Sequence, residues 1–116
     1  MATAATNYSG CNNYSQSHRW GTWPQNRDVQ DVSYICWKSG LLSYRTVHVN
    51  LGSFFCSTSD PYSYRTNGGT GSAFVVWSDG GYFACPTGVP YIELHFNQYM
   101  GLEAVDAPSY WIYTYN

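Results

Sequence analysis

The chain has 116 residues, of which 10% are charged, 19% are aromatic and 44% are hydrophobic, and its formal net charge is −2. The hydrophobic fraction is typical of globular domains, which argues against disorder, and the length favours a single domain over residues 1–116. A weakly negative chain lacks the positive field that attracts nucleic acids and anionic lipids, and no apolar run is long enough to span a bilayer, so neither nucleic-acid binding nor membrane insertion is expected.

The amino-terminal part of the chain is polar and has no regular period. Residues 1–31 are rich in Asn, Ser, Gln and Thr, so we expect irregular or short edge structure held by Cys11, with residues 1–10 as a flexible arm. The first residues are small, like those left after signal-peptide cleavage, and glycosylation sequons begin at Asn7 and Asn13. These features indicate an extracellular protein whose signal peptide has been removed.

The next segments have the composition of β-strands. Residues 32–37 and 41–51 are predicted strands joined by a turn at Lys38–Gly40, and residues 53–56 form a further short strand. Along 41–51, one face carries Arg45, Val47, Val49 and Leu51, and the other carries Tyr44, Thr46, His48 and Asn50. This alternation predicts a half-buried strand with one face in water.

Turn-forming residues interrupt the middle of the chain. The stretch after the third cysteine is predicted to be a long loop, with turns at Asp60-Pro61 and Asn67–Gly69. Residues 73–77 and 82–85 are predicted to form a hairpin through Ser78–Gly81, because an Asp-Gly pair tolerates the positive φ angles that such turns require.

The last third of the chain again has strand patterns. Residues Tyr91–Phe96 alternate strictly between apolar and polar side chains, a short helical turn is expected within Gln98–Val105, and residues 109–115 form a final strand docked into the sheet. Six to seven short strands at this spacing predict an all-β fold, a small disulfide-braced antiparallel sandwich or barrel.

The four cysteines are Cys11, Cys36, Cys56 and Cys85. Their number is even and none of them form a C-x-x-C pair, so we expect two disulfides, of which three pairings are possible, and not a metal or redox site. Disulfides of this kind favour an extracellular location.

Residues suited to acid-base catalysis are few. His48, Glu93 and His95 lie on polar faces of predicted strands and would supply the acid and base of a small ribonuclease, with Arg45 or Arg65 to neutralise an anionic transition state. The competing interpretation is that they are ordinary surface residues. No spacing places the three histidines on one element as metal ligands, and neither a metal nor another cofactor is expected.

The aromatic residues carry a stronger signal, because Tyr, Trp and Arg supply most of the binding energy at interfaces. The candidate binding residues lie in predicted loops and are Arg19, Trp20, Trp23, Tyr62, Tyr64 and Arg65. Other aromatic residues are expected to form the core, namely Trp37, Phe54, Phe55, Trp77, Phe83 and Phe96.

The predicted function is that of a secreted, non-catalytic binding module. It would recognise a glycan or the surface of a target enzyme through exposed aromatic loops, for example as a hydrolase inhibitor, and act as a monomer or weak homo-oligomer. One alternative is a small secreted hydrolase such as a ribonuclease, for which RNA would be the partner. The other is a structural or coat protein that self-associates through its tyrosine-rich terminal strand.

The cysteine order and one short motif resemble those of the small secreted proteinaceous α-amylase inhibitors of the tendamistat type. The matching residues are Cys11, His18-Arg19-Trp20, Cys36, Cys56 and Cys85. Those inhibitors are six-stranded β-sandwiches with two sequential disulfides and an exposed Trp-Arg-Tyr triplet that enters the glycosidase active site. The resemblance implies the bridges Cys11–Cys36 and Cys56–Cys85 and an inhibitory role for Arg19 and Trp20. His18 stands where the family has Trp, and the residues after Cys85 have no counterpart in it.

Overall fold

The computed structural model describes residues 9–86, 91–102 and 109–115, the last range by its backbone alone. These residues form seven antiparallel strands: β1 (Gly10–Trp20), β2 (Arg27–Lys38), β3 (Leu41–Gly52), β4 (Ser57–Asn67), β5 (Phe74–Ala84), β6 (Ile92–Gly101) and β7 (Ser109–Tyr115).

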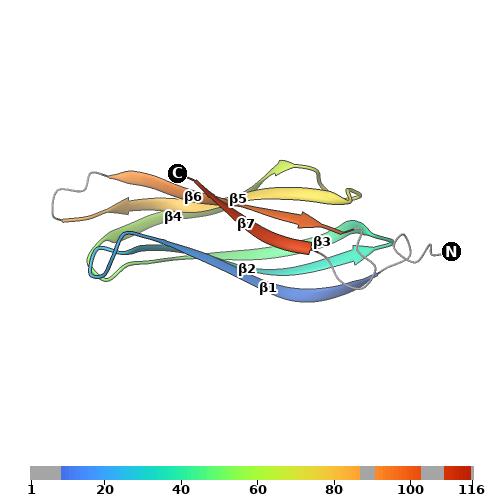
Figure 1. The fold of residues 1–116 in the computed structure, drawn as a ribbon, viewed down its shortest axis with the longest axis horizontal. Coiled ribbons are helices and arrows are strands. Elements are labelled where there is room, and N and C mark those ends of the chain that lie inside the picture. Colours follow the sequence, from blue (N-terminus) through green and yellow to red (C-terminus); the bar gives the residue numbers. More distant parts are fainter. Residues whose placement is uncertain (1–8, 87–90, 103–108, 116) are drawn as a thin grey trace.

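The strands form two sheets that pack face to face as a sandwich. Sheet A has the order β1-β2-β3 and sheet B has the order β4-β5-β6-β7, so the chain crosses between the sheets once, in the link from β3 to β4 (Figure 1). The molecule is elongated, with extents of 60 × 20 × 19 Å. The predicted all-β sandwich is therefore confirmed, but β1 to β6 have 10–12 residues each where short strands were expected.

The polar amino-terminal segment forms a complete edge strand. β1 pairs with β2 along its whole length, so the expectation of irregular or short edge structure is wrong for this segment. Its side chains alternate between exposed and half-buried positions over most of the strand. An edge strand has one strand neighbour and one wet face, which explains why polar residues dominate a segment that is nevertheless fully paired.

The Asp-Gly segment lies in the middle of a strand, and the predicted hairpin through Ser78–Gly81 is wrong. β5 passes through this segment without a turn and pairs with both β4 and β6 there. The glycines serve close packing instead: a Cβ atom on Gly80 would lie 2.4 Å from the carbonyl oxygen of Leu94, and one on Gly81 would lie 2.3 Å from Cδ1 of Leu51. Only glycine fits where other groups approach a strand this closely.

Two neighbouring segments also differ from the prediction. The segment Ser53–Cys56, a predicted strand, is a bend that links the two sheets. The predicted loop that follows is β4, in which Asp60 has a φ of 54° and the pairing shifts between Ser59 and Tyr62. Asp60 and Pro61 thus form a bulge inside an edge strand, where proline is tolerated because its missing N–H removes no ladder bond.

The strictly alternating segments form the strands that were predicted. β2 and β3 meet at a tight turn, in which Ser39 and Gly40 have φ angles of 55° and 74°. β7 is docked at the edge of sheet B, as expected. β6 continues to Gly101, so the helical turn expected within Gln98–Val105 is wrong over its first part, and residues 103–105 lie outside the described ranges.

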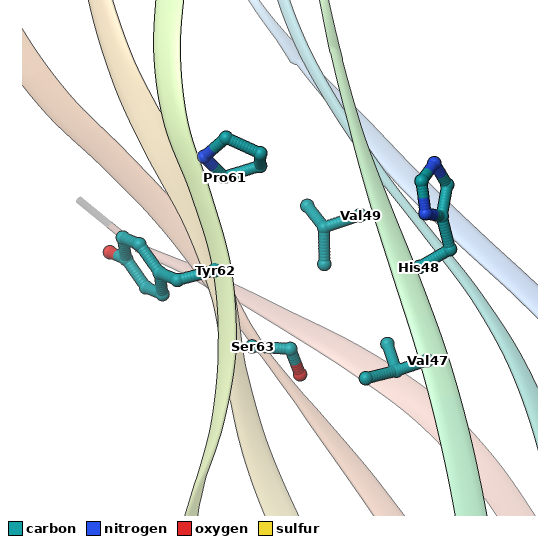
Figure 2. A pocket seen from close by; sticks show the side chains of 6 residues that line it. All are labelled: Val47, His48, Val49, Pro61, Tyr62 and Ser63. Carbon is teal, nitrogen blue, oxygen red and sulfur yellow. The ribbon is translucent and has the colours of Figure 1, made fainter.

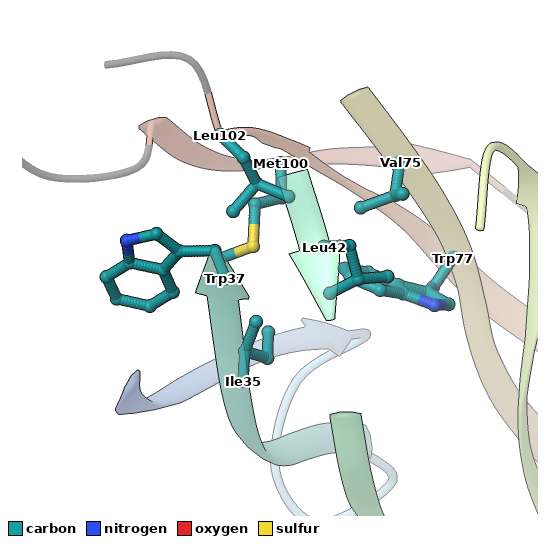
Figure 3. Close-up of a cluster of buried hydrophobic side chains, with 7 residues drawn as sticks. All are labelled: Ile35, Trp37, Leu42, Val75, Trp77, Met100 and Leu102. Carbon is teal, nitrogen blue, oxygen red and sulfur yellow. The ribbon is translucent and has the colours of Figure 1, made fainter. Parts of the chain in front are cut away.

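The core of the sandwich contains two hydrophobic clusters. One consists of Ile35, Trp37, Leu42, Val75, Trp77, Met100 and Leu102 (Figure 3). The other consists of Val29, Phe83, Leu94 and Phe96, with Trp20, Val49, Leu51 and Ile92 packed against it. Both clusters take side chains from both sheets, so burial of apolar surface holds the sheets together.

A cluster of polar side chains is also buried between the sheets. Arg45 Nη2 lies 2.9 Å from Oδ2 of Asp31 and 3.7 Å from Oδ1 of Asp79. Nε2 of Gln98 donates to both carboxylates, and the Ser63 hydroxyl accepts from Arg45 at 3.0 Å. Each side chain comes from a different strand, β2 to β6, so this polar cluster ties the two sheets together.

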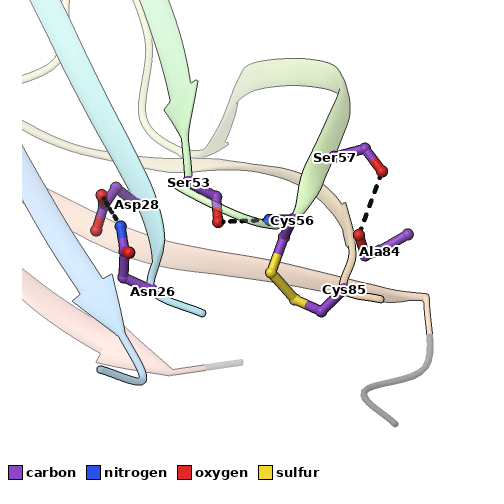
Figure 4. The surroundings of a disulfide bond; sticks show 7 residues. All are labelled: Asn26, Asp28, Ser53, Cys56, Ser57, Ala84 and Cys85. Atoms are coloured by element: carbon purple, nitrogen blue, oxygen red, sulfur yellow. Dashed lines mark hydrogen bonds between the residues drawn. A yellow bond between two sulfur atoms is a disulfide. The ribbon is translucent and has the colours of Figure 1, made fainter. Parts of the chain in front are cut away.

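Two disulfides brace the sandwich, Cys11–Cys36 and Cys56–Cys85. The predicted number is confirmed, and these are the sequential pairs that the resemblance implied. The first bridge joins residues directly opposite each other on β1 and β2, whereas the second ties the bend after β3 to the end of β5 (Figure 4).

Candidate functional site

Three exposed aromatic side chains meet at one end of the sandwich, and we call them the aromatic tip: Trp23, Phe54 and Phe55. Trp23 lies in the loop between β1 and β2, and the two phenylalanines lie in the bend between β3 and β4. The ring centroids are 5.1 Å apart for Trp23 and Phe54 and 5.3 Å apart for Phe54 and Phe55. The three residues are 64%, 62% and 52% exposed.

The two segments that carry the aromatic tip are fixed to each other and to sheet B. The Phe55 amide donates to the carbonyl oxygen of Pro24 at 3.0 Å, which joins the loop to the bend. The Cys56 amide donates to the Ser53 hydroxyl at 3.0 Å, and the bridge to Cys85 follows directly (Figure 4). The backbone of the tip is therefore held in place by hydrogen bonds and a disulfide.

Arg19 and Trp20, the candidate pair next to this loop, lie on opposite faces of β1. Arg19 forms a two-point ion pair with Asp28, at 2.6 and 3.1 Å, beside a shallow hollow of about 490 Å³ on the outer face of sheet A. This hydrogen-bonded pair lowers the pKa of the Asp28 carboxyl and raises that of the guanidinium. Trp20 instead packs against a core cluster, so Arg19 and Trp20 do not form one exposed binding element.

Four tyrosines form a line on the outer face of sheet B, and we call them the tyrosine row: Tyr64, Tyr62, Tyr82 and Tyr91. Successive ring centroids are 5.4, 6.4 and 5.5 Å apart. Tyr64 and Tyr91, at its two ends, are more than half exposed. Of the residues expected in the loop after the third cysteine, Tyr62 and Tyr64 thus belong to this strand surface, while the guanidinium of Arg65 lies against Gly69 of the next loop.

Glu93 lies beside the tyrosine row and affects its hydroxyl groups. The Tyr62 hydroxyl donates a short hydrogen bond to the Glu93 carboxylate. Burial raises the pKa of Tyr62, and this hydrogen bond raises it further. The charge of Glu93 also raises the pKa of Tyr82. Both tyrosines are therefore neutral hydrogen-bonding groups at any physiological pH.

The three candidate catalytic residues do not come together. Glu93 and His95 alternate along β6 with the buried Leu94 and therefore lie on the outer face of sheet B. His48 lies on β3 and points out of sheet A (Figure 2). His48 thus lies on the outer face of one sheet, and Glu93 and His95 lie on the outer face of the other. The structure therefore offers no shared site for a general acid and base.

A groove of about 220 Å³ separates the edges of β3 and β4, with His48 and Tyr62 on its two rims. It is lined by Val47, His48, Val49, Pro61, Tyr62 and Ser63. The rings of His48 and Tyr62 point away from the groove, whereas the two valines, the proline and the serine point into it (Figure 2). The groove thus presents little chemistry beyond the Ser63 hydroxyl, which is bonded to Arg45.

The acidic side chain with the largest pKa shift, that of Asp79, is inaccessible. Asp31 and Asp79 are fully buried, and burial, together with the nearby Asp31 carboxylate, raises the pKa of Asp79 to about 8. A carboxyl pair of this kind is suited to acid-base chemistry only when a substrate can reach it, so we assign it a structural role. Within the described residues, no cluster of His, Cys, Asp and Glu could hold a metal ion.

No protein-family profile, no curated protein sequence and no solved structure matches this chain. The part of the chain that the structure describes contains no helix long and apolar enough to cross a membrane.

The sequence indicated some members of these surfaces and missed others. Trp37, Trp77, Phe83 and Phe96 are core residues, as predicted. Phe54 and Phe55 were predicted to be buried and are exposed instead, because the predicted strand that carried them is a bend. Their contact with the candidate Trp23, which lies in another loop, appears only in three dimensions. Tyr91 lay on the predicted polar face of its strand, and that alternation was the available signal.

Proposed function

We propose that the protein is a secreted, non-catalytic binding module that recognises the surface of another protein, such as a target enzyme, through the aromatic tip. The observation that carries this proposal is the contact among three large aromatic rings that are each more than half exposed. Exposed apolar side chains gathered at one place are typical of interaction sites, whereas single ones are common on any surface.

The chemistry of the tip favours a protein partner. Trp and Phe are enriched in the centres of protein interfaces, where burial of their rings supplies much of the binding energy. Of the three tip side chains, only the indole of Trp23 carries a polar group, so the tip offers a sugar few hydrogen-bond partners. The fixed backbone reduces the entropy lost on binding.

Secretion is supported by the disulfides. Two bridges in a chain of 116 residues are compatible with an oxidising, extracellular environment. The enzymatic alternative has no comparable support, because His48 is separated from Glu93 and His95.

Binding assays against a panel of purified secreted glycosidases and proteases test this proposal. We expect saturable binding to at least one of them, weakened about tenfold or more by the double substitution Trp23→Ser and Phe54→Ser, since loss of a central aromatic contact costs more than about 1 kcal/mol. Tyr44→Ser is the matched control, because Tyr44 is exposed on a face of sheet A away from the tip.

Two results would contradict the proposal. One is the absence of binding across the panel. The other is binding that the tip substitutions leave unchanged, or that Tyr44→Ser reduces equally. Inhibition of the bound enzyme would further identify the module as an inhibitor.

A further inference from the structure

We propose that the tyrosine row is a second binding site, and that its ligand is a linear, uncharged polysaccharide chain. This site is distinct from the aromatic tip: three of its four residues lie on strands, and all of its side chains carry hydroxyl groups. The inference rests on the arrangement of the four rings, on the polar groups beside them and on the local charge.

The rings are arranged along a line that suits an extended chain. Tyr64 and Tyr62 alternate along β4, and the register then places Tyr82 one further step along the sheet, opposite Ser59 and Glu93. Tyr91 stands just before β6 begins and stacks on Tyr82, with ring planes 15° apart. Each ring-to-ring step of 5.4 to 6.4 Å is comparable to the length of one hexose unit. A ligand with one repeating unit per step would therefore match the spacing of the row.

The surface is amphipathic in the way a sugar requires. A tyrosine ring presents an apolar face, which suits the C–H face of a pyranose, and a hydroxyl group that hydrogen-bonds with sugar hydroxyls. The carboxylate of Glu93 accepts hydrogen bonds at the middle of the row, and His95 lies next to it on the same face of β6.

The charge of the row favours an uncharged ligand. Glu93 is negative and exposed. Arg65 directly follows Tyr64 in the sequence, but its guanidinium lies against Gly69. An anionic polymer would be repelled by this carboxylate, and no lysine or arginine among the described residues lies in the row to compensate.

The row is also formed in advance of binding. Tyr62 crosses directly over Gly80, where a Cβ atom would lie 2.7 Å from the tyrosine hydroxyl. The absence of a side chain on β5 at this point lets the ring lie across the sheet and reach Glu93. Rings fixed on paired strands lose little conformational freedom when a ligand arrives.

Affinity electrophoresis in gels containing soluble polysaccharides tests the site. The probes are three neutral polymers, a β-glucan, a xylan and a galactomannan, and one anionic polymer, polygalacturonate. The variant is Tyr64→Ala with Tyr91→Ala, which truncates the two exposed ends of the row and leaves its half-buried middle positions, Tyr62 and Tyr82, intact. Tyr44→Ala is the control for an exposed tyrosine elsewhere.

We expect at least one neutral polymer to retard the wild-type protein and the Tyr44 variant. The Tyr64/Tyr91 variant should bind that polymer at least about tenfold more weakly. The tip variant, Trp23→Ser with Phe54→Ser, should be retarded like the wild type, which separates this site from the proposed protein-binding function. The inference is overturned if no neutral polymer binds, if only polygalacturonate binds, or if the Tyr64/Tyr91 variant is retarded like the wild type.

Discussion

Asp31 and Asp79 share one guanidinium in the interior of the sandwich, that of Arg45. One cation cannot neutralise two buried carboxylates, and the unfavourable burial of the second charge is relieved when Asp79 holds a proton. The pKa of Asp79 is raised to about 8 for this reason, first by burial and then by Asp31. The folded state therefore prefers the protonated form of Asp79. In the unfolded chain, the same carboxyl group loses its proton near its ordinary pKa of 3.8.

This preference predicts stability that decreases as pH rises. The contribution of Asp79 is complete below about pH 4 and is lost progressively towards about pH 8, because the unfolded state releases the proton first. In Asp79→Asn, which stays neutral, the free energy of unfolding should lack this decline and exceed the wild-type value at pH 8 by about 1 kcal/mol or more, since one pKa unit corresponds to about 1.4 kcal/mol. Urea denaturation at pH 5 and pH 8 measures the difference.

Asp28 serves as the control of opposite sign. Its pKa is lowered by its hydrogen-bonded pair with Arg19, so its contribution is present above its ordinary pKa and is lost as pH falls. Asp28→Asn should reduce stability by no more than about 1 kcal/mol, since the pair is exposed to solvent, and it should leave the decline towards pH 8 unchanged. Parallel pH profiles for wild type and Asp79→Asn would refute the assignment.

At the scale of the element, alternating segments were predicted correctly, and segments with the composition of turns were not. The segments with strict alternation, 41–51 and 91–96, became strands as predicted, because one face of each meets the core. The segment Ser78–Gly81 has the composition of a turn, but glycine permits close approach as well as positive φ, and the sequence does not distinguish these uses. A paired Pro61 was likewise misinterpreted, because an edge-strand bulge has the composition of a loop.

The close packing around β5 predicts how its glycines respond to substitution. Gly80→Ala should destabilise the fold by about 1–3 kcal/mol, the usual range for overpacking, because the new methyl would meet the backbone oxygen of Leu94. Gly81→Ala should also destabilise it, but adding Leu51→Ala should recover part of the loss, since only a side chain stands in the way.

Gly52→Ala is the comparison for these variants. A methyl at Gly52 would make only ordinary contacts, at 3.9 Å or more, so this change should have little effect on the midpoint of thermal unfolding. A Gly80→Ala protein as stable as Gly52→Ala would show that β5 does not pack as described.

At the scale of the whole molecule, the two disulfides have similar loop lengths and different local roles. Sequence separations of 25 and 29 residues each correspond to about 3.5 kcal/mol in the chain-entropy account. Replacing either cysteine pair by serine should therefore lower stability by similar amounts. Only loss of Cys56–Cys85 should also release the bend that carries Phe54 and Phe55.

Amide hydrogen exchange separates these two effects. In Cys56→Ser with Cys85→Ser, the Phe55 amide should exchange faster relative to amides at the centre of β5, because its hydrogen bond to Pro24 loses its anchor. In Cys11→Ser with Cys36→Ser, the ratio of the two exchange rates should stay near that of the wild type. Equal ratios in both variants would mean that the bridge does not hold the aromatic tip.

The candidate surfaces themselves depended on distant contacts that a sequence does not reveal. Trp20 and Trp23 are three residues apart, but Trp20 packs against the core, whereas Trp23 contacts Phe54 in the bend after β3. Tyr62 was recognised as a candidate, whereas its neighbour Tyr82 came from the segment assigned to a hairpin arm. Residue type indicated which side chains were candidates for binding, and only strand register indicated which of them stand together.

The elongated shape gives the molecule a direction. The aromatic tip lies at the end where β1 meets β2, and β1 itself begins at the opposite end (Figure 1). β1 has 11 residues, which span about 35 Å at the rise of a β-strand, so a support coupled ahead of β1 would hold the tip at about that distance. The domain would then act as a rigid spacer, whose strands set the distance between the aromatic tip and that support.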